Sequence, residues 1–230
     1  MDFGMKLVWI LVSIIALLPA LTLHEWAHGF AAYKLGDTTA KADGRLSINP
    51  LDHLEPMGAL MMLLVGFGWA KPVPVNTRRL RNPRRDLAII SLAGPLMNFF
   101  VALVSAVLYA FALILCNAIE ASAMTAFVVE IIFQSLIIYN VGLGTFNLIP
   151  LPPLDGSNVL MCFLPPRVAA KYSRIRYYTQ YIFLGIILLT YLPYPLSIIS
   201  DIFFMPLEFI RDGLMDLLIG LTDLILSLFY

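Results

Sequence analysis

Long apolar runs, separated by short polar and basic segments, dominate the pattern of this chain. A helix needs about 20 consecutive apolar residues to cross the hydrocarbon core of a bilayer. The pattern therefore predicts four long membrane spans, at about Leu7 to Ala32, Leu87 to Leu115, Thr125 to Leu148 and Tyr181 to Ile199. The first run continues into a polar motif without a small-x-small cleavage site, so we interpret it as a retained span rather than a signal peptide.

Three further stretches are expected to complete the fold. Met57 to Ala70 is apolar but short for a crossing, which favours a re-entrant or interfacial segment. Arg45 to Ile48 is expected to be a short strand or the edge of a hairpin. Pro206 to Tyr230 mixes apolar and charged residues, and predicts either an amphipathic interfacial helix or a fifth span. The expected fold class is an all-α polytopic membrane protein with four to six transmembrane or re-entrant helices and a small hairpin between the first two long spans.

Composition supports this class. Apolar residues make up 60% of the chain and charged residues 13%, against about 25% charged in typical soluble domains. We therefore expect one membrane-embedded domain over residues 1–230, with a core at about 7–165 and C-terminal helices at about 181–230. The net charge of zero gives no case for nucleic-acid binding. Cys116 and Cys162 are predicted to be small buried apolar residues rather than a disulfide.

Two basic loops predict the topology. Basic loops are enriched on the cytoplasmic side of membranes. If Met57 to Ala70 does not cross, residues 34–86 and 150–180 lie on the same, cytoplasmic side and the N-terminus lies outside. His24 lies about 25 Å along the helix from Leu7, which places it toward the cytoplasmic end of the hydrocarbon layer. The residues that define these loops are Arg78, Arg79, Arg81, Arg84 and Arg85 in the first, and Arg167, Lys171, Arg174 and Arg176 in the second.

The first span carries the most informative motif, HEWAH. His24 and His28 are four residues apart, so on a helix both imidazoles lie on one face and can reach a single metal ion. Glu25 beside them is then placed to take the proton of an attacking water. Insertion of a charged side chain in a membrane helix costs about 2.5–3.5 kcal/mol, so these polar residues are not expected here without a function. The alternative is that the two histidines only form hydrogen bonds between helices.

A catalytic zinc ion usually has three protein ligands, so a third ligand is expected. Asp155 follows the third long span in a proline-rich turn, at the depth and side of the membrane where the histidines lie. His53 is the remaining histidine, but it lies in a charged loop with no element to aim it inward. The residues therefore favour Asp155 over His53. The loop acids Asp37, Asp43, Asp52 and Glu55 are expected to be solvated.

Three motifs in order carry a resemblance to a known family. HEWAH in the first span, AGPLMNF in the second and NLIPLPPLDG at the end of the third resemble the site-2 protease family of intramembrane zinc metalloproteases. The resemblance covers about residues 7–165. GWAKPVPVN is similar to a segment that many bacterial members carry between the first two motifs. No PDZ-like insertion or CBS-like extension is evident, so the chain resembles a minimal bacterial-type core.

The resemblance implies a role for each motif residue. His24, His28 and Asp155 would bind one Zn²⁺, and Glu25 would be the general base. Asn147 would bind the substrate carbonyl or its oxyanion, although a capping or interhelical hydrogen bond is the alternative for this amide. For Asn98 we favour a packing or supporting role over direct catalysis.

The resulting expectation is a zinc-dependent intramembrane endopeptidase that cleaves transmembrane segments, in regulated intramembrane proteolysis or in the clearance of membrane peptides. Its partners would be a membrane-protein or membrane-peptide substrate and the lipid bilayer of a bacterial cell (inner) membrane, with the active site toward the cytoplasm. A homo-oligomer is not indicated. Either the extended AKPVPVN segment or the hairpin near Arg45 to Ile48 would offer the unwound substrate a strand edge. The alternatives are a non-proteolytic membrane-protein binding or quality-control factor and, less consistent with a glutamate base, a metal transporter.

Overall fold

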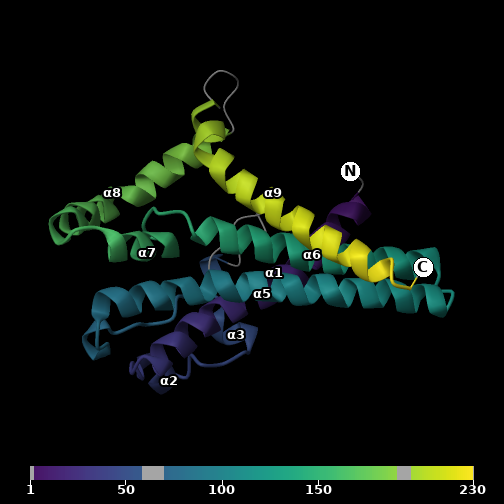
Figure 1. Cartoon of the computed structure of the whole chain (residues 1–230), viewed down its shortest axis with the longest axis horizontal. Coiled ribbons are helices and arrows are strands. Elements are labelled where there is room, and N and C mark those ends of the chain that lie inside the picture. Colours follow the sequence, from purple (N-terminus) through teal and green to yellow (C-terminus); the bar gives the residue numbers. More distant parts are fainter. Residues whose placement is uncertain (1–2, 59–69, 191–197, 230) are drawn as a thin grey trace.

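The computed structural model describes residues 3–58, 70–190 and 198–229, and these ranges are mostly helical. Three long helices form the centre: α1 (Phe3–Lys34), α5 (Pro83–Ala118) and α6 (Ala123–Asn147). The remaining elements are the helices α2 (Thr39–Ala42), α3 (Pro50–His53), α7 (Asp155–Phe163), α8 (Pro166–Thr190) and α9 (Ile198–Leu226), and the 3-10 helix η1 (Thr77–Arg79) (Figure 1). The predicted all-α class is confirmed.

The three central helices correspond to the first three predicted spans. Among the described residues, Leu11–Lys34, Pro83–Ala118 and Ala123–Asn147 are the helices long and apolar enough to cross a membrane. An unbroken helix satisfies nearly all its backbone hydrogen bonds internally, as the hydrocarbon region requires. Large apolar side chains such as Leu11 and Phe100 remain 51% and 59% exposed, which is the surface expected to face lipid.

Small residues allow α5, α6 and α9 to pack closely. Ala102 and Ala106 of α5 are fully buried against Ile137 and Val141 of α6 and against Leu218 of α9. Lipid tails are as apolar as these side chains, so close van der Waals packing rather than escape from water stabilises such contacts. The bundle is therefore closed on this face by α9 (Figure 1).

The predicted fourth span is described only in part. Residues 181–190 belong to α8, whereas residues 191–197 lie outside the described residues, so this crossing remains a prediction.

The C-terminal tail is one amphipathic helix, α9, which begins before Pro206 and continues through it. Its C-terminal half packs on the bundle, where Thr222 Oγ1 donates to the Ala106 carbonyl at 3.3 Å. Its acidic side chains keep it outside the set of helices apolar enough to cross, and all are exposed: Asp201, Glu208, Asp212, Asp216 and Asp223.

The segment between α1 and α5 differs from the predicted hairpin. Residues 45–49 have no regular secondary structure, and strand pairing among the described residues is limited to one antiparallel bridge between Leu54 and Ala70. Residues 59–69, which are most of the predicted re-entrant segment Met57 to Ala70, lie outside the described residues.

A buried arginine takes the place of a strand ladder here. The Arg45 side chain is 7% exposed and its guanidinium donates to the carbonyl groups of Asp52 and Lys71. Lys71 N–H in turn donates to the His53 carbonyl at 2.8 Å. One side chain therefore joins the two sides of the loop and occupies carbonyl groups that a paired strand would use.

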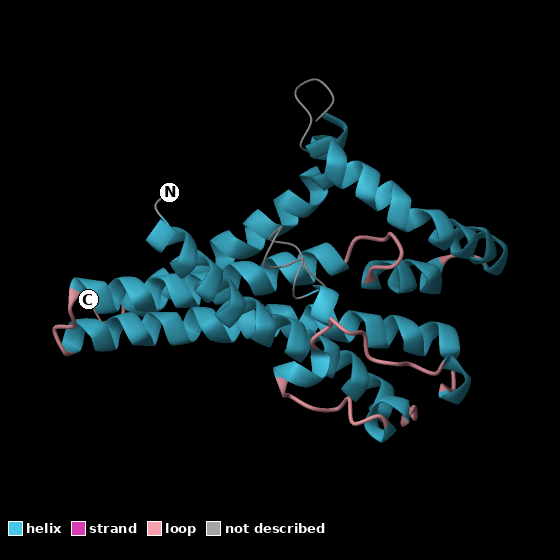
Figure 2. Ribbon diagram, turned by 180° about the vertical axis from the view of Figure 1, so that it is seen from behind, coloured by secondary structure: helices cyan, strands magenta, loops and turns pink. Residues whose placement is uncertain are grey.

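Helix α7 is attached along the first part of α5. Asn158 Nδ2 donates to Ser91 Oγ at 2.8 Å. Arg84 Nε donates to the Met161 carbonyl at 2.7 Å, and its Nη2 donates to the Leu164 carbonyl, so Arg84 caps the C-terminus of α7. Figure 2 shows that the loops gather at this end of the bundle, whereas the short α5–α6 turn lies at the opposite end.

We expect Arg84→Met to loosen α7 and with it Asp155, the first residue of that helix. Loss of the cap should lower the unfolding temperature by about 2–4 °C for each kcal/mol lost, and should weaken metal binding. Thermal unfolding and zinc titration of the purified chain measure both effects. Arg81→Met is the matched control, since Arg81 is exposed and forms no such cap. Equal results for the two variants would contradict this role.

Candidate metal centre

The HEWAH motif of α1 and the start of α7 meet at one point. Asp155 Oδ2 lies 3.2 Å from His24 Nε2 and 3.2 Å from His28 Nε2. The two Nε2 atoms are 3.0 Å apart. The structure therefore brings together the three predicted ligands, although more than a hundred residues separate the histidines from Asp155.

Each imidazole is held through its other nitrogen. His28 Nδ1 lies 2.7 Å from the Ile90 carbonyl oxygen, which can only accept a hydrogen bond, so Nδ1 carries the proton. His24 Nδ1 lies 2.6 Å from Asn98 Oδ1 in the same relation. Both Nε2 atoms therefore present lone pairs toward Asp155. Such supporting hydrogen bonds are what orient metal-binding histidines.

The donor set fits a zinc ion. Ligand atoms about 2.0–2.1 Å from a tetrahedral ion lie roughly 3.3–3.4 Å from one another, close to the 3.0–3.2 Å seen here. Asp155 Oδ2 is buried and has no hydrogen-bond partner among the described residues. Two imidazole lone pairs and a carboxylate oxygen repel one another unless a cation or proton lies between them. The cluster His24, His28 and Asp155 is suited to hold one metal ion.

Gly94 of α5 makes room for both imidazoles. A Cβ atom at this position would lie 2.5 Å from His28 Nε2 and 2.6 Å from His24 Cε1. Contacts under 3.0 Å do not occur for real Cβ atoms, so the rings pack directly on the glycine backbone. The glycine of the AGP part of the second motif therefore supports the metal site by letting the backbone of α5 approach both imidazoles closely.

A tight turn delivers Asp155. The chain leaves α6 at Asn147 and re-enters a helix at Asp155, with Gly156 against the end of α6. A Cβ atom on Gly156 would lie 2.1 Å from the Leu148 carbonyl oxygen, so only glycine fits.

An extended segment, residues 71–76, runs past Glu25, and we call it the strap. Val73 N–H donates to Glu25 Oε2 at 2.9 Å. Val73 also packs on Gly29, where a Cβ atom would come within 3.2 Å of Val73 Cγ1. Arg45 holds the start of the strap through the Lys71 carbonyl. The strap is therefore fixed beside the predicted general base.

The far end of the strap is anchored by Asp37, a loop acid that was predicted to be solvated. That expectation is wrong for Asp37: its carboxyl is fully buried and accepts from Asn76 N–H at 2.6 Å and from Thr39 Oγ1. Burial raises the pKa of Asp37, but these hydrogen bonds lower it by a larger amount, so its pKa lies below the ordinary value. Asp43 and Asp52 are exposed as expected, and Glu55 accepts from Gly58 N–H.

Other candidate residues lie outside the cluster. His53 is buried with Nε2 2.7 Å from the Ser47 carbonyl, and it does not join the three ligands. Asn147 Nδ2 donates to the Leu143 carbonyl of its own helix at 3.0 Å. Asn98 supports His24, in agreement with the supporting role that its position predicted.

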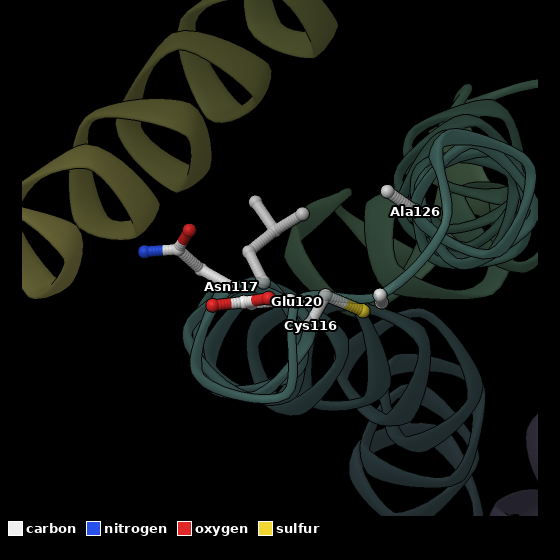
Figure 3. Close-up of a pocket in the computed structure, with 6 residues that line it drawn as sticks. Cys116, Asn117, Glu120 and Ala126 are labelled. Atoms are coloured by element: carbon white, nitrogen blue, oxygen red, sulfur yellow. The ribbon is translucent and has the colours of Figure 1, made fainter.

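Both cysteines are free and half-buried, so the expected absence of a disulfide between them agrees with the structure, whereas full burial does not. Cys116 lines an open hollow of ≈ 440 Å³ with Asn117, Glu120 and Ala126 at the α5–α6 turn (Figure 3). This hollow lies at the opposite end of α5 from Gly94 and plays no part in the metal centre.

Three residues that shape the site were not predicted from the sequence: Arg45, Asp37 and Asn140. Asn140 of α6 is fully buried and bonds to Asn98 at 3.0 Å. A polar side chain in the middle of an apolar span was an available signal, because such residues are costly unless partnered. Arg45 and Asp37 carried no comparable signal, since charged loop residues are usually solvated.

A three-ligand site whose two histidines and neighbouring glutamate lie on a helix able to cross a bilayer is typical of a membrane metalloprotease. Residues 12–190 match the model of peptidase family M50, and the chain belongs to this site-2 protease family. "Putative zinc metalloprotease YwhC" of Bacillus subtilis (strain 168) is 41% identical over 173 residues, 74% of this chain and 77% of its own length.

More distant relatives carry the same description under the name Rip2. The protein of Mycolicibacterium smegmatis is 33% identical over 155 residues, and that of Mycobacterium tuberculosis (strain Erdman) is 32% identical over 157. Each match covers 65% of this chain and 56% of the relative. No solved structure matches the chain. The protein is thus a membrane zinc metalloprotease.

We expect Gly94→Ala to disrupt the metal centre, because the added methyl group must displace both imidazoles. Overpacking costs about 1–3 kcal/mol, which is roughly five- to 150-fold in zinc affinity if it falls on the site. Zinc titration of the purified chain measures the loss. Gly142→Ala in α6 is the matched control, since its Cβ atom would meet nothing within 4 Å. A Gly94→Ala variant with unchanged zinc affinity would contradict the close contact.

Proposed function

We propose that this membrane metalloprotease is an intramembrane endopeptidase that cleaves transmembrane segments of membrane proteins or membrane peptides. The observation that carries the proposal is the position of His24 and His28 within Leu11–Lys34, a helix long and apolar enough to cross a bilayer. A site on such a helix is within reach of a substrate held in the same bilayer. Regulated proteolysis and clearance of membrane peptides both fit this chemistry.

In this proposal His24, His28 and Asp155 hold the zinc ion, which when bound supplies a Lewis acid for water and for the scissile carbonyl. Glu25 is the general base: it takes a proton from the attacking water and later gives it to the leaving amine. The hydrogen bond from Val73 N–H to Glu25 Oε2 supports this role, because it fixes the direction of the carboxylate.

Asn147 is proposed to bind the substrate carbonyl or its oxyanion. Its amide already uses one N–H for the Leu143 carbonyl. A primary amide has two N–H groups, so one donor remains for a substrate oxygen. Asn147 is the last residue of α6, close in the chain to Asp155, which supports a place beside the reacting carbonyl.

The strap is proposed to receive the unwound substrate by strand addition. A helical substrate hides its scissile carbonyl within its own hydrogen bonds, so it must become extended before cleavage. The carbonyl groups of Val73 and Val75 form no hydrogen bond with the rest of the described chain, which leaves them open for a partner. Pro72 and Pro74 favour an extended backbone and lack N–H groups.

The active site is proposed to face the cytoplasm. The basic residues Arg78, Arg79 and Arg81 follow the strap directly in the chain, and basic loops are retained on the cytoplasmic side. The host membrane is proposed to be a bacterial cell membrane, since YwhC and Rip2 are bacterial proteins.

We expect Glu25→Gln to abolish cleavage of a model transmembrane segment while zinc binding persists. Loss of a general base typically costs about 10²–10⁴-fold in rate. The glutamine carbonyl can still accept from Val73 N–H, so the strap should remain in place. Asp155→Ala should lose zinc as well as activity. Purified wild-type protein without zinc would refute the metal centre, and full cleavage by Glu25→Gln would refute the role of Glu25.

Replacement of Pro72 and Pro74 by alanine tests strand addition. Each proline reduces the conformational entropy of the flexible chain, which contributes about 0.4–1 kcal/mol to the free energy of holding it extended. Each replacement should therefore lower kcat/KM by roughly two- to fivefold with zinc content unchanged. Cleavage of the model segment and zinc analysis measure the two quantities. Pro50→Ala at the start of α3 is the control, since it lies outside the strap. Unchanged cleavage by the double variant would count against the strap.

A further inference from the structure

A buried hydrogen-bond chain runs from α6 through α5 to His24 of α1. Asn140 Nδ2 lies 2.8 Å from the Leu136 carbonyl oxygen, and Asn140 Oδ1 lies 3.0 Å from Asn98 Nδ2. Asn98 Nδ2 also lies 3.1 Å from the Ala20 carbonyl oxygen. Asn98 Oδ1 then meets His24 Nδ1 at 2.6 Å. Three helices thus contribute to one polar chain.

The two backbone carbonyl groups fix the direction of the whole chain. A carbonyl oxygen can only accept, so the nitrogen of Asn140 must face Leu136 and its oxygen must face Asn98. The nitrogen of Asn98 must then face Ala20 and Asn140, which leaves its oxygen toward His24. His24 Nδ1 must therefore carry the proton. The Nε2 lone pair is left for the metal centre.

Burial makes this direction hard to reverse. The side chains of Asn98 and Asn140 are both 0% exposed, so no solvent can satisfy an amide that turns over. A reversed amide would set N–H against N–H and oxygen against oxygen. An unsatisfied buried polar group costs about 1–3 kcal/mol, and the low dielectric of the surroundings raises such penalties.

The two histidines differ in the group that holds Nδ1. His28 Nδ1 bonds directly to the Ile90 carbonyl, a backbone group that no side-chain substitution removes. The orientation of His24 depends on its contact with Asn98, and the orientation of Asn98 depends in part on its contact with Asn140. We propose that Asn140 is a positioning residue of the metal centre, which acts through Asn98 to set the tautomer and direction of His24. This inference rests on the proposed function of the cluster as the zinc site.

Zinc affinity, measured by titration of metal-free full-length protein in detergent against a chromophoric chelator, tests the chain without any cleavage assay. Asn98→Leu should lower the affinity by about 10–100-fold, as for other groups that orient a metal ligand. Asn140→Leu should lower it less, at the lower end of that range. The double variant should match Asn98→Leu alone, because Asn140 then has no partner to act through.

Thr145→Val is the control on the same helix. Thr145 is buried, but its hydroxyl donates to the Val141 carbonyl within α6, so its loss should leave zinc affinity unchanged. Asn140→Thr is the conservative variant, because a threonine hydroxyl can donate to the carbonyl four residues earlier and still accept from Asn98. It should retain more zinc affinity than Asn140→Leu, and it remains informative if the leucine variant fails to fold.

Thermal unfolding of the metal-free variants separates positioning from stability. A merely structural role predicts that Asn140→Leu lowers the unfolding temperature while zinc affinity equals that of the wild type, and this result would overturn the inference. Full additivity with Asn98→Leu, or an Asn140→Thr variant no better than Asn140→Leu, would also overturn it. Failure of the proposed protease function would appear differently, as intact zinc binding without cleavage by the wild type.

Discussion

The structure depends on one constraint: a polar group placed among membrane helices must find its partner within the protein. Lipid offers no hydrogen bonds, and an unpaired group costs several kcal/mol there. His28 meets this constraint with the Ile90 carbonyl, and His24 meets it with Asn98. The helices can adopt only those positions in which these bonds form together. The polar groups that serve the site therefore also fix how α1 and α5 pack.

The same constraint explains how distant residues meet so closely. Gly94 lets the two imidazoles rest on the backbone of α5, and Gly156 lets α7 begin against the end of α6. Asp155 then arrives 3.2 Å from both Nε2 atoms. At both positions glycine has no side chain, so the neighbouring group packs directly on the backbone. Shape thus brings the three acceptor atoms together, and a cation relieves their mutual repulsion.

The sequence predicted the parts of this structure that depend on local pattern. The first three spans follow from long apolar runs, and the residues of the metal cluster follow from helical spacing and from the family motifs. The predicted strand at residues 45–48 is not formed, because a single buried side chain, Arg45, joins two loop segments by bonding to backbone carbonyls. The anchoring role of Asp37 was likewise hidden. Such long-range contacts leave no periodicity in the chain.

The surroundings of α1 change along its length. Early in α1, Leu11 and Ile15 are each 51% exposed, as suits a lipid-facing surface. Between two and a half and three turns beyond Ile15, at about 3.6 residues per turn, the helix carries His24 and Glu25. Val73 N–H of the strap donates to the Glu25 carboxylate. The strap is held from outside the span by Arg45 and Asp37, whose charges require nearby water or paired backbone groups. The end of α1 that carries the two histidines therefore lies where the apolar surface gives way to a polar, anchored loop. The proposed hydrolysis of a membrane substrate is compatible with a site at that boundary.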